Sequence, residues 1–192
     1  MSHRRPVALN PEIERHLSPK AARQIMLTLF DTISPHARRC TIVFSPEEDP
    51  DLAAALRAFE DQVVWKPYTV PWPNWMRRGW GCVLAPWIRL GLIHPTPSVH
   101  VEAQLAPELL PVLRESLDTC RLRHLHLWDD TSTPLWASWD CGATWFAFLT
   151  SEEFQELNRQ LSERWHSPSA MLVWETEDVR AYLANEGLTD SH

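Results

Sequence analysis

Two neighbouring segments of the chain are apolar on both of their faces, and this limits the possible folds more than any other feature. They cover residues 135–139 and 143–149 and flank an Asp-Cys-Gly sequence that is typical of a hairpin turn. A strand that is apolar on both faces belongs in the interior of a sheet, where both faces are covered. We therefore predict a central hairpin whose tryptophans form part of the core: Trp136, Trp139 and Trp145.

The rest of the chain alternates helix patterns with strand patterns. Apolar residues recur at helical spacing over about residues 19–33, 50–63, 107–117 and 150–165, and a last helix is expected after Thr176. Alternating or β-branched runs predict strands at about 40–44, 64–70, 98–103, 122–128 and 171–174. This order predicts an α+β fold with a mixed, mostly antiparallel sheet and helices packed on it.

The chain has 192 residues, which suits one domain of ordinary size. Residues 1–17 carry two prolines and no apolar period, so we expect an extended N-terminal arm. Residues 18–192 are expected to form a single compact α+β domain. Within it, residues 71–97 are rich in tryptophan, proline and glycine and are expected to form an irregular loop.

Charge and hydropathy restrict where the protein works and what it binds. Residues 1–40 have a net charge of +4 and residues 41–192 a net charge of −11. Such an acidic body makes nucleic acid an unlikely partner and suits a basic protein. No apolar run reaches the length of a membrane-spanning helix, and the N-terminus does not resemble a signal peptide, so we expect a cytoplasmic protein without a membrane partner.

Two predicted strands carry residues that can bind a metal ion. His100 and Glu102 lie two apart on one strand, and His124 and His126 lie two apart on another, so each pair shares a face. If the two strands are neighbours, three imidazoles and one carboxylate converge, and these groups are common zinc ligands. The alternative is that they are ordinary residues on the polar face of a sheet, and we expect no metal and no cofactor.

Motifs of enzyme active sites are otherwise absent. The chain has no GxSxG or SxxK sequence for a nucleophile, no Gly-rich phosphate loop and no CxxC pair. Asp129, Asp130 and Asp140 could join the histidines in acid–base chemistry, although they also fit ordinary loops. These observations leave enzymatic activity open and favour a binding protein.

A short segment combines the residue types that dominate protein interfaces. Tryptophan offers a large contact area and arginine a planar set of donors. We predict a partner-binding site there, formed by Trp72, Trp75, Arg77, Arg78 and Trp80. The alternative is that these tryptophans fold back onto the sheet.

Together these features predict a non-enzymatic protein that binds or inhibits a protein partner. As a small acidic α+β protein it is similar, at the level of class only, to bacterial immunity proteins, which mask the active site of a toxin. Two alternatives remain open. One is a metal-dependent hydrolase or nuclease that uses the His/Asp cluster, and the other is a sensor that binds a small molecule in an aromatic pocket.

Overall fold

The computed structural model describes residues 4–59, 63–68, 98–139, 142, 144–167 and 169–175. An eight-stranded sheet has the order β3-β4-β2-β5-β6-β7-β1-β8, and every strand pair in it is antiparallel. The strands are β1 (Arg5–Leu9), β2 (Arg39–Phe44), β3 (Val63–Tyr68), β4 (Ser98–Gln104), β5 (Leu122–Trp128), β6 (Pro134–Trp139), β7 (Thr144–Leu149) and β8 (Leu172–Trp174). The helices are α1 (Pro11–Glu14), α2 (Pro19–Ile33), the 3₁₀ turn η1 (Ser34–His36), α3 (Pro50–Arg57), α5 (Leu109–Asp118) and α6 (Ser151–Trp165).

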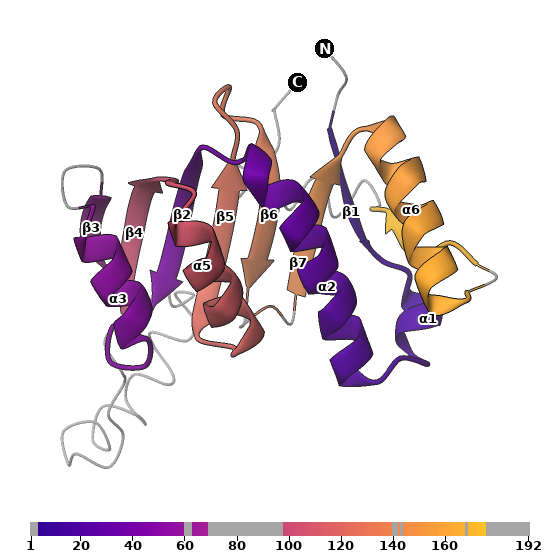
Figure 1. Cartoon of the computed structure of the whole chain (residues 1–192), viewed down its shortest axis with the longest axis horizontal. Helices are drawn as coiled ribbons and strands as arrows, with labels where there is room; N and C mark the ends of the chain where they lie inside the picture. Colours follow the sequence, from indigo (N-terminus) through magenta and orange to yellow (C-terminus); the bar gives the residue numbers. More distant parts are fainter. Residues whose placement is uncertain are drawn as a thin grey trace, which may run out of the picture.

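The described helices form one layer against one face of the sheet, as Figure 1 shows for α2, α3, α5 and α6. Their apolar residues join those of the strands in one large core. We call the opposite side of the sheet the helix-free face, because no described helix packs on it. This two-layer arrangement confirms the predicted α+β class.

Helix starts follow from local capping. Ser18 accepts a hydrogen bond from the backbone N–H of Ala21 at the start of α2, and Asp49 accepts one from Leu52 at the start of α3. Thr150 and Glu153 form a capping box at the start of α6, with each side chain bonded to the other residue's backbone N–H. The positions of these three helices therefore follow from sequence signals that stabilise isolated helix ends.

The hairpin prediction is confirmed in β6, in which all six residues are buried. Trp136 is fully buried, packs edge-on against Phe30 of α2 and stacks on Trp145 of β7, with ring centroids 5.6 Å apart in each pair. Trp139 is buried on the helix-free face. The central position of β6 explains why both of its faces are apolar.

The N-terminal segment corrects the predicted arm. Residues 5–9 form β1, which pairs with β7 on one side and with β8 on the other. Val7 and Leu9 alternate into the main core, so this segment belongs to the domain rather than extending from it. An alternation over five residues, interrupted by Pro6, is shorter than the patterns that predict a strand from sequence alone.

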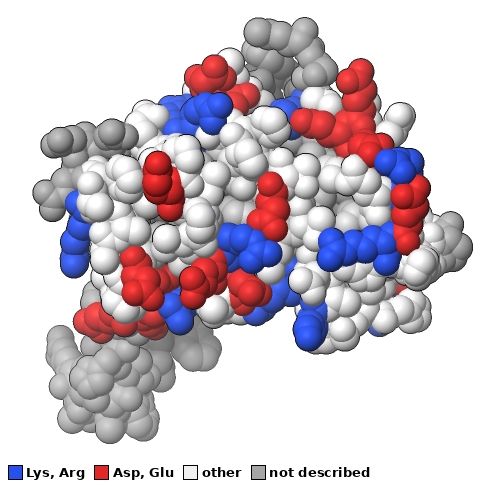
Figure 2. Space-filling view, viewed as in Figure 1, with Lys and Arg blue, Asp and Glu red and all other residues white. Residues whose placement is uncertain are grey.

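On the helix-covered side of the molecule, surface charge is mixed rather than separated (Figure 2). Figure 2 shows acidic and basic side chains interspersed over the helix-covered side of the molecule. Several are paired, including Arg114 with Asp31 at 2.7 Å and Arg159 with Glu156 at 2.6 Å. Within the described residues, no helix has the length and apolar character needed to cross a membrane.

Candidate binding cleft on the helix-free face

The helix-free face carries polar and aromatic side chains in rows that cross three neighbouring strands. Alternate residues of a strand point to the same face, and the register of β4, β2 and β5 places them side by side. Read from β4 through β2 to β5, the rows are Gln104, Arg39 and Trp128; Glu102, Thr41 and His126; and His100, Val43 and His124.

A cleft of about 530 Å³ lies over the first two rows. Thr41 lies between Glu102 and His126, and its short side chain leaves space between longer neighbours. The described residues that line the cleft are Arg39, Cys40, Thr41, Val64, Glu102, Ala103, Gln104, Trp128 and Ser132. The cleft is open to solvent on one side, and its volume lies within the range of sites that hold small molecules.

One of the charged residues that line the cleft, Glu102, is paired with an opposite charge. Lys66 Nζ lies 2.7 Å from Oε1 of Glu102, and Nε2 of His100 lies 3.8 Å from the same oxygen. The hydrogen bond from Lys66 lowers the pKa of the Glu102 carboxyl, outweighing the smaller opposing effect of burial. Glu102 is therefore an ionised carboxylate whose charge is balanced within the sheet.

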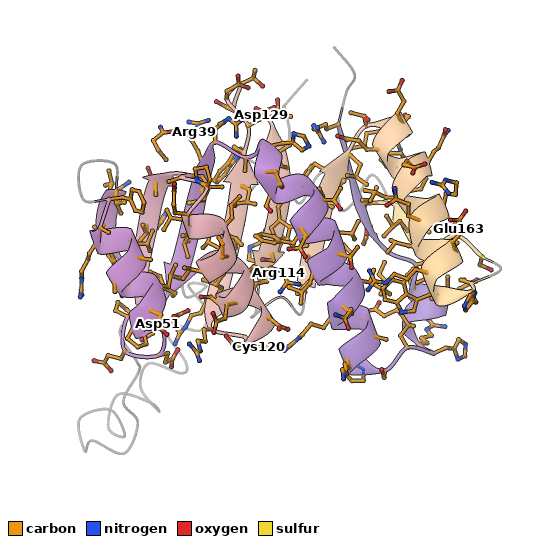
Figure 3. All side chains as sticks on the ribbon, in the orientation of Figure 1. Arg39, Asp51, Arg114, Cys120, Asp129 and Glu163 are labelled. Carbon is orange, nitrogen blue, oxygen red and sulfur yellow. The ribbon has the colours of Figure 1, made fainter. Side chains whose placement is uncertain are left out.

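Arg39 is bonded differently. Nη2 of Arg39 donates a hydrogen bond to Oγ of Ser132 at 2.5 Å. Within the described residues, this uncharged hydroxyl is the one group to which the Arg39 side chain is hydrogen-bonded. Figure 3 places Arg39 at the same end of the sheet as Asp129, and far from Cys120 and Asp51 at the other end. The guanidinium thus keeps donors and a positive charge that Ser132 does not satisfy.

The turn between β5 and β6 positions Ser132. Oδ1 of Asp129 accepts hydrogen bonds from the backbone N–H groups of Thr131 and Thr133 at 2.9 and 2.8 Å, and from the Thr131 hydroxyl at 2.8 Å. Burial works against ionisation of Asp129, but these hydrogen bonds outweigh it and lower the pKa of the carboxyl. Within the turn Ser132 has a φ of 69°, a left-handed conformation.

His126 lies between two tryptophans at the border of the cleft. Its ring meets Trp128 and Trp139 edge-on, with ring centroids 5.7 and 5.1 Å apart. Burial lowers its pKa to about 4, helped by the nearby charges of His124 and His100. His126 is therefore neutral at pH 7, and within the described residues its Nε2 is buried without a hydrogen-bond partner.

The face divides into a polar part and an apolar part. Beyond His126 a second hydrophobic cluster covers β6 and β7, formed by Ala137, Trp139, Phe146 and Phe148. Trp128 packs against this cluster and also lines the cleft. One side of the cleft is thus an indole anchored on buried apolar residues, while its other side combines the polar residues Glu102 and Gln104 with the exposed Val64.

The condition under which the histidines would converge is not met, because β4 and β5 are not neighbours and β2 lies between them. Val43 separates His100 from His124, and Thr41 separates Glu102 from His126. Since neighbouring strands lie about 4.8 Å apart, residues two strands apart are about 10 Å apart at their Cα atoms. Among the residues that the structure describes, no three His, Cys, Asp or Glu side chains are grouped closely enough to hold a metal ion.

The other candidate residues are not brought into one site. Asp129 is occupied by its own turn, and Asp140 lies outside the described residues. The whole predicted partner-binding segment also lies outside them, with Trp72, Trp75, Arg77, Arg78 and Trp80. Its binding role stays a prediction.

Arg39, Thr41 and Gln104 were not predicted from the sequence as site residues. The available signal was weak, because polar residues alternate with apolar ones in many strands that have a solvent-facing side. What makes these three a site is the position of β2 between β4 and β5, and this pairing of distant segments is not visible in local patterns. Comparisons of the chain with protein-family models, curated proteins and solved structures find no match.

Proposed function

We propose that this protein is a non-enzymatic binding protein that holds a small molecule in the cleft over β4, β2 and β5. The observation that carries the proposal is a cleft of about 530 Å³ lined by hydrogen-bonding side chains and one indole. Small-molecule sites combine an apolar surface with a few polar groups that fix the orientation of the ligand. Trp128 supplies the first element, and Arg39 and Gln104 supply the second.

The rigidity of the lining supports this proposal. Most lining residues lie on strands, and β2 is paired along its whole length with a strand on each side. Side chains on paired strands are held more accurately than side chains on loops, so little entropy is lost when a ligand binds. A sensor or carrier of a small molecule needs such a preformed site.

The two other functions expected from the sequence remain predictions. A protein that masks a toxin would use the segment around Trp75 and Arg77, which the structure does not describe. A metal-dependent hydrolase would need the histidines of β4 and β5 to act across β2. Metal analysis of the purified protein, and co-purification with candidate toxins, would test these two alternatives directly.

The proposal is tested by a ligand-observed NMR screen of a small-molecule fragment library against the wild-type protein and two variants. Thr41→Phe places a large ring on the floor of the cleft, whereas Thr32→Phe makes the same change on the exposed surface of α2. We expect several fragments to bind the wild type and Thr32→Phe, and to bind Thr41→Phe at least tenfold more weakly. Fragments that bind all three proteins equally, or an absence of binding to the wild type, would refute the proposal.

A further inference from the structure

We infer that the ligand of the cleft is a planar organic anion, whose carboxylate or phosphate binds Arg39 and whose ring packs on Trp128. This inference rests on the proposed function and adds the chemical class of the ligand. It is carried by three features of the lining, which are the charge balance, the unused donors of one guanidinium and the position of the indole.

Of the two charged residues in the described lining, Arg39 is the one without an ion-pair partner among the described residues. Arg39 and Glu102 are the charged residues among the described lining. Glu102 is paired with Lys66 at 2.7 Å, whereas Arg39 is bonded to the uncharged Ser132 hydroxyl. A ligand carboxylate or phosphate would compensate the charge of Arg39, while a cation would be repelled by it.

The donors of Arg39 match an anionic group in geometry. A guanidinium has five N–H donors in a planar fork, which suits the paired oxygens of a carboxylate or phosphate. Ser132 engages Nη2, and within the described residues no other hydrogen bond satisfies the Arg39 side chain. Gln104 lies directly opposite Arg39 in β4 and adds an amide that can donate to the same anion.

The indole of Trp128 is the reason to expect a planar ligand. Trp128 lies directly opposite Arg39 on the other side of β2, so an anion bound to Arg39 would extend over an aromatic surface. The edge-on contact with His126 holds the indole in place. Aromatic rings stack on such a surface with a gain beyond simple burial, and this favours a flat ligand over a branched one.

The test compares three naphthalene compounds by isothermal titration calorimetry. They are 2-naphthoate, 2-naphthyl phosphate and the neutral 2-naphthamide, which share one ring system and differ in the head group. Each is titrated into the wild type, into Arg39→Gln and into Arg38→Gln. Arg38 is exposed and lies outside the described cleft lining, so Arg38→Gln makes the same change of charge one residue away.

We expect at least one anion to bind the wild type and Arg38→Gln about tenfold more tightly than the amide, and Arg39→Gln to remove this preference. The tighter of the two anions identifies the head group. Equal binding of the amide, or an anion preference that survives in Arg39→Gln, would overturn the anion assignment while leaving a binding cleft in place. No binding by any of the three compounds would also overturn it, and the fragment screen then decides separately whether the cleft binds small molecules at all.

Discussion

Arg39 and Trp128 are directly opposite each other in the antiparallel pairing of β2 with β5, and both side chains line the cleft on the helix-free face. A charge and an indole are therefore held side by side by backbone pairing rather than by a loop. The pairing of β5 with β6 shifts register between Leu127 and Trp128, so that Trp128 lies opposite Pro134. This irregularity is where the strand leads into the turn that carries Ser132.

Protonation of His126 should make the fold sensitive to acid. The pKa of His126 is about 4 in the folded protein and near 6.5 when the chain is unfolded, so the unfolded state binds more protons between these values. The free energy of unfolding should therefore fall as the pH is lowered from 7 toward 4, with His126 contributing about 2 to 3 kcal/mol of the loss.

Urea denaturation at pH 7 and pH 4.5 measures this effect in the wild type, in His126→Phe and in His16→Phe. Phenylalanine at 126 keeps a ring between the two tryptophans and removes the titrating group, so the acid sensitivity should decrease. His16 is exposed, and its replacement should leave the sensitivity in place. Equal acid sensitivity in all three proteins would contradict the buried, neutral state of His126.

Asp49 should stabilise α3 mainly as its N-cap. It is buried, its Oδ1 accepts the backbone N–H of Leu52 at 3.1 Å, and Arg121 lies 3.8 Å from the same oxygen. Asp49→Ala removes the acceptor and should lower the free energy of unfolding by about 1 to 2 kcal/mol. Asp49→Asn keeps an acceptor and should lose less, and an equal loss in both variants would show that the charge matters more than the cap.

His166 should carry backbone strain that glycine relieves. It ends α6 in a left-handed conformation with φ of 50°, and the N–H of Ser167 closes the turn onto the carbonyl of Ser162 at 2.9 Å. The left-handed region is unfavourable for a residue with a Cβ atom but not for glycine. We expect this gain to exceed the larger backbone entropy that glycine loses on folding, so His166→Gly should raise the free energy of unfolding by about 0.5 to 1 kcal/mol. Thermal and urea unfolding measure this, with His166→Ala as the control that keeps the strain. A destabilised His166→Gly would contradict the assigned helix end.

Trp136 should be the most costly tryptophan to remove from the described core. It is fully buried between Phe30 and Trp145, so Trp136→Ala leaves a cavity and should cost about 3 to 5 kcal/mol in the free energy of unfolding. Trp145 is only partly buried, and Trp145→Ala should cost clearly less. Urea denaturation of the two variants compares these costs. A larger loss for Trp145→Ala would place the centre of the core elsewhere.

Local patterns were sufficient for most elements of the fold. The starts of α2, α3 and α6 follow from capping residues that act within one helical turn, and β6 follows from its apolar residues on both faces. The failure at β1 has a physical reason, because a five-residue strand gains its stability from pairing with β7 and β8 rather than from its own sequence.

The candidate site depended on information that local patterns do not carry. The histidines of β4 and β5 were correctly placed on strands, but the insertion of β2 between them changes which side chains are neighbours. The same insertion brings Arg39 between Gln104 and Trp128 and so creates the cleft. Strand order is decided by the packing of the whole chain, and for this reason local sequence patterns do not predict Arg39 as a site residue.

The central claim is that the cleft over β4, β2 and β5 binds a small molecule. The most direct measurement is to titrate the ¹⁵N-labelled protein with the fragments of the screen and to record which backbone amide signals shift. The account predicts that the shifts concentrate at residues 39–41, 102–104 and 128–132 and need at least tenfold more fragment in Thr41→Phe. Shifts concentrated on α2, α5 or α6, or no shifts with any fragment, would contradict it.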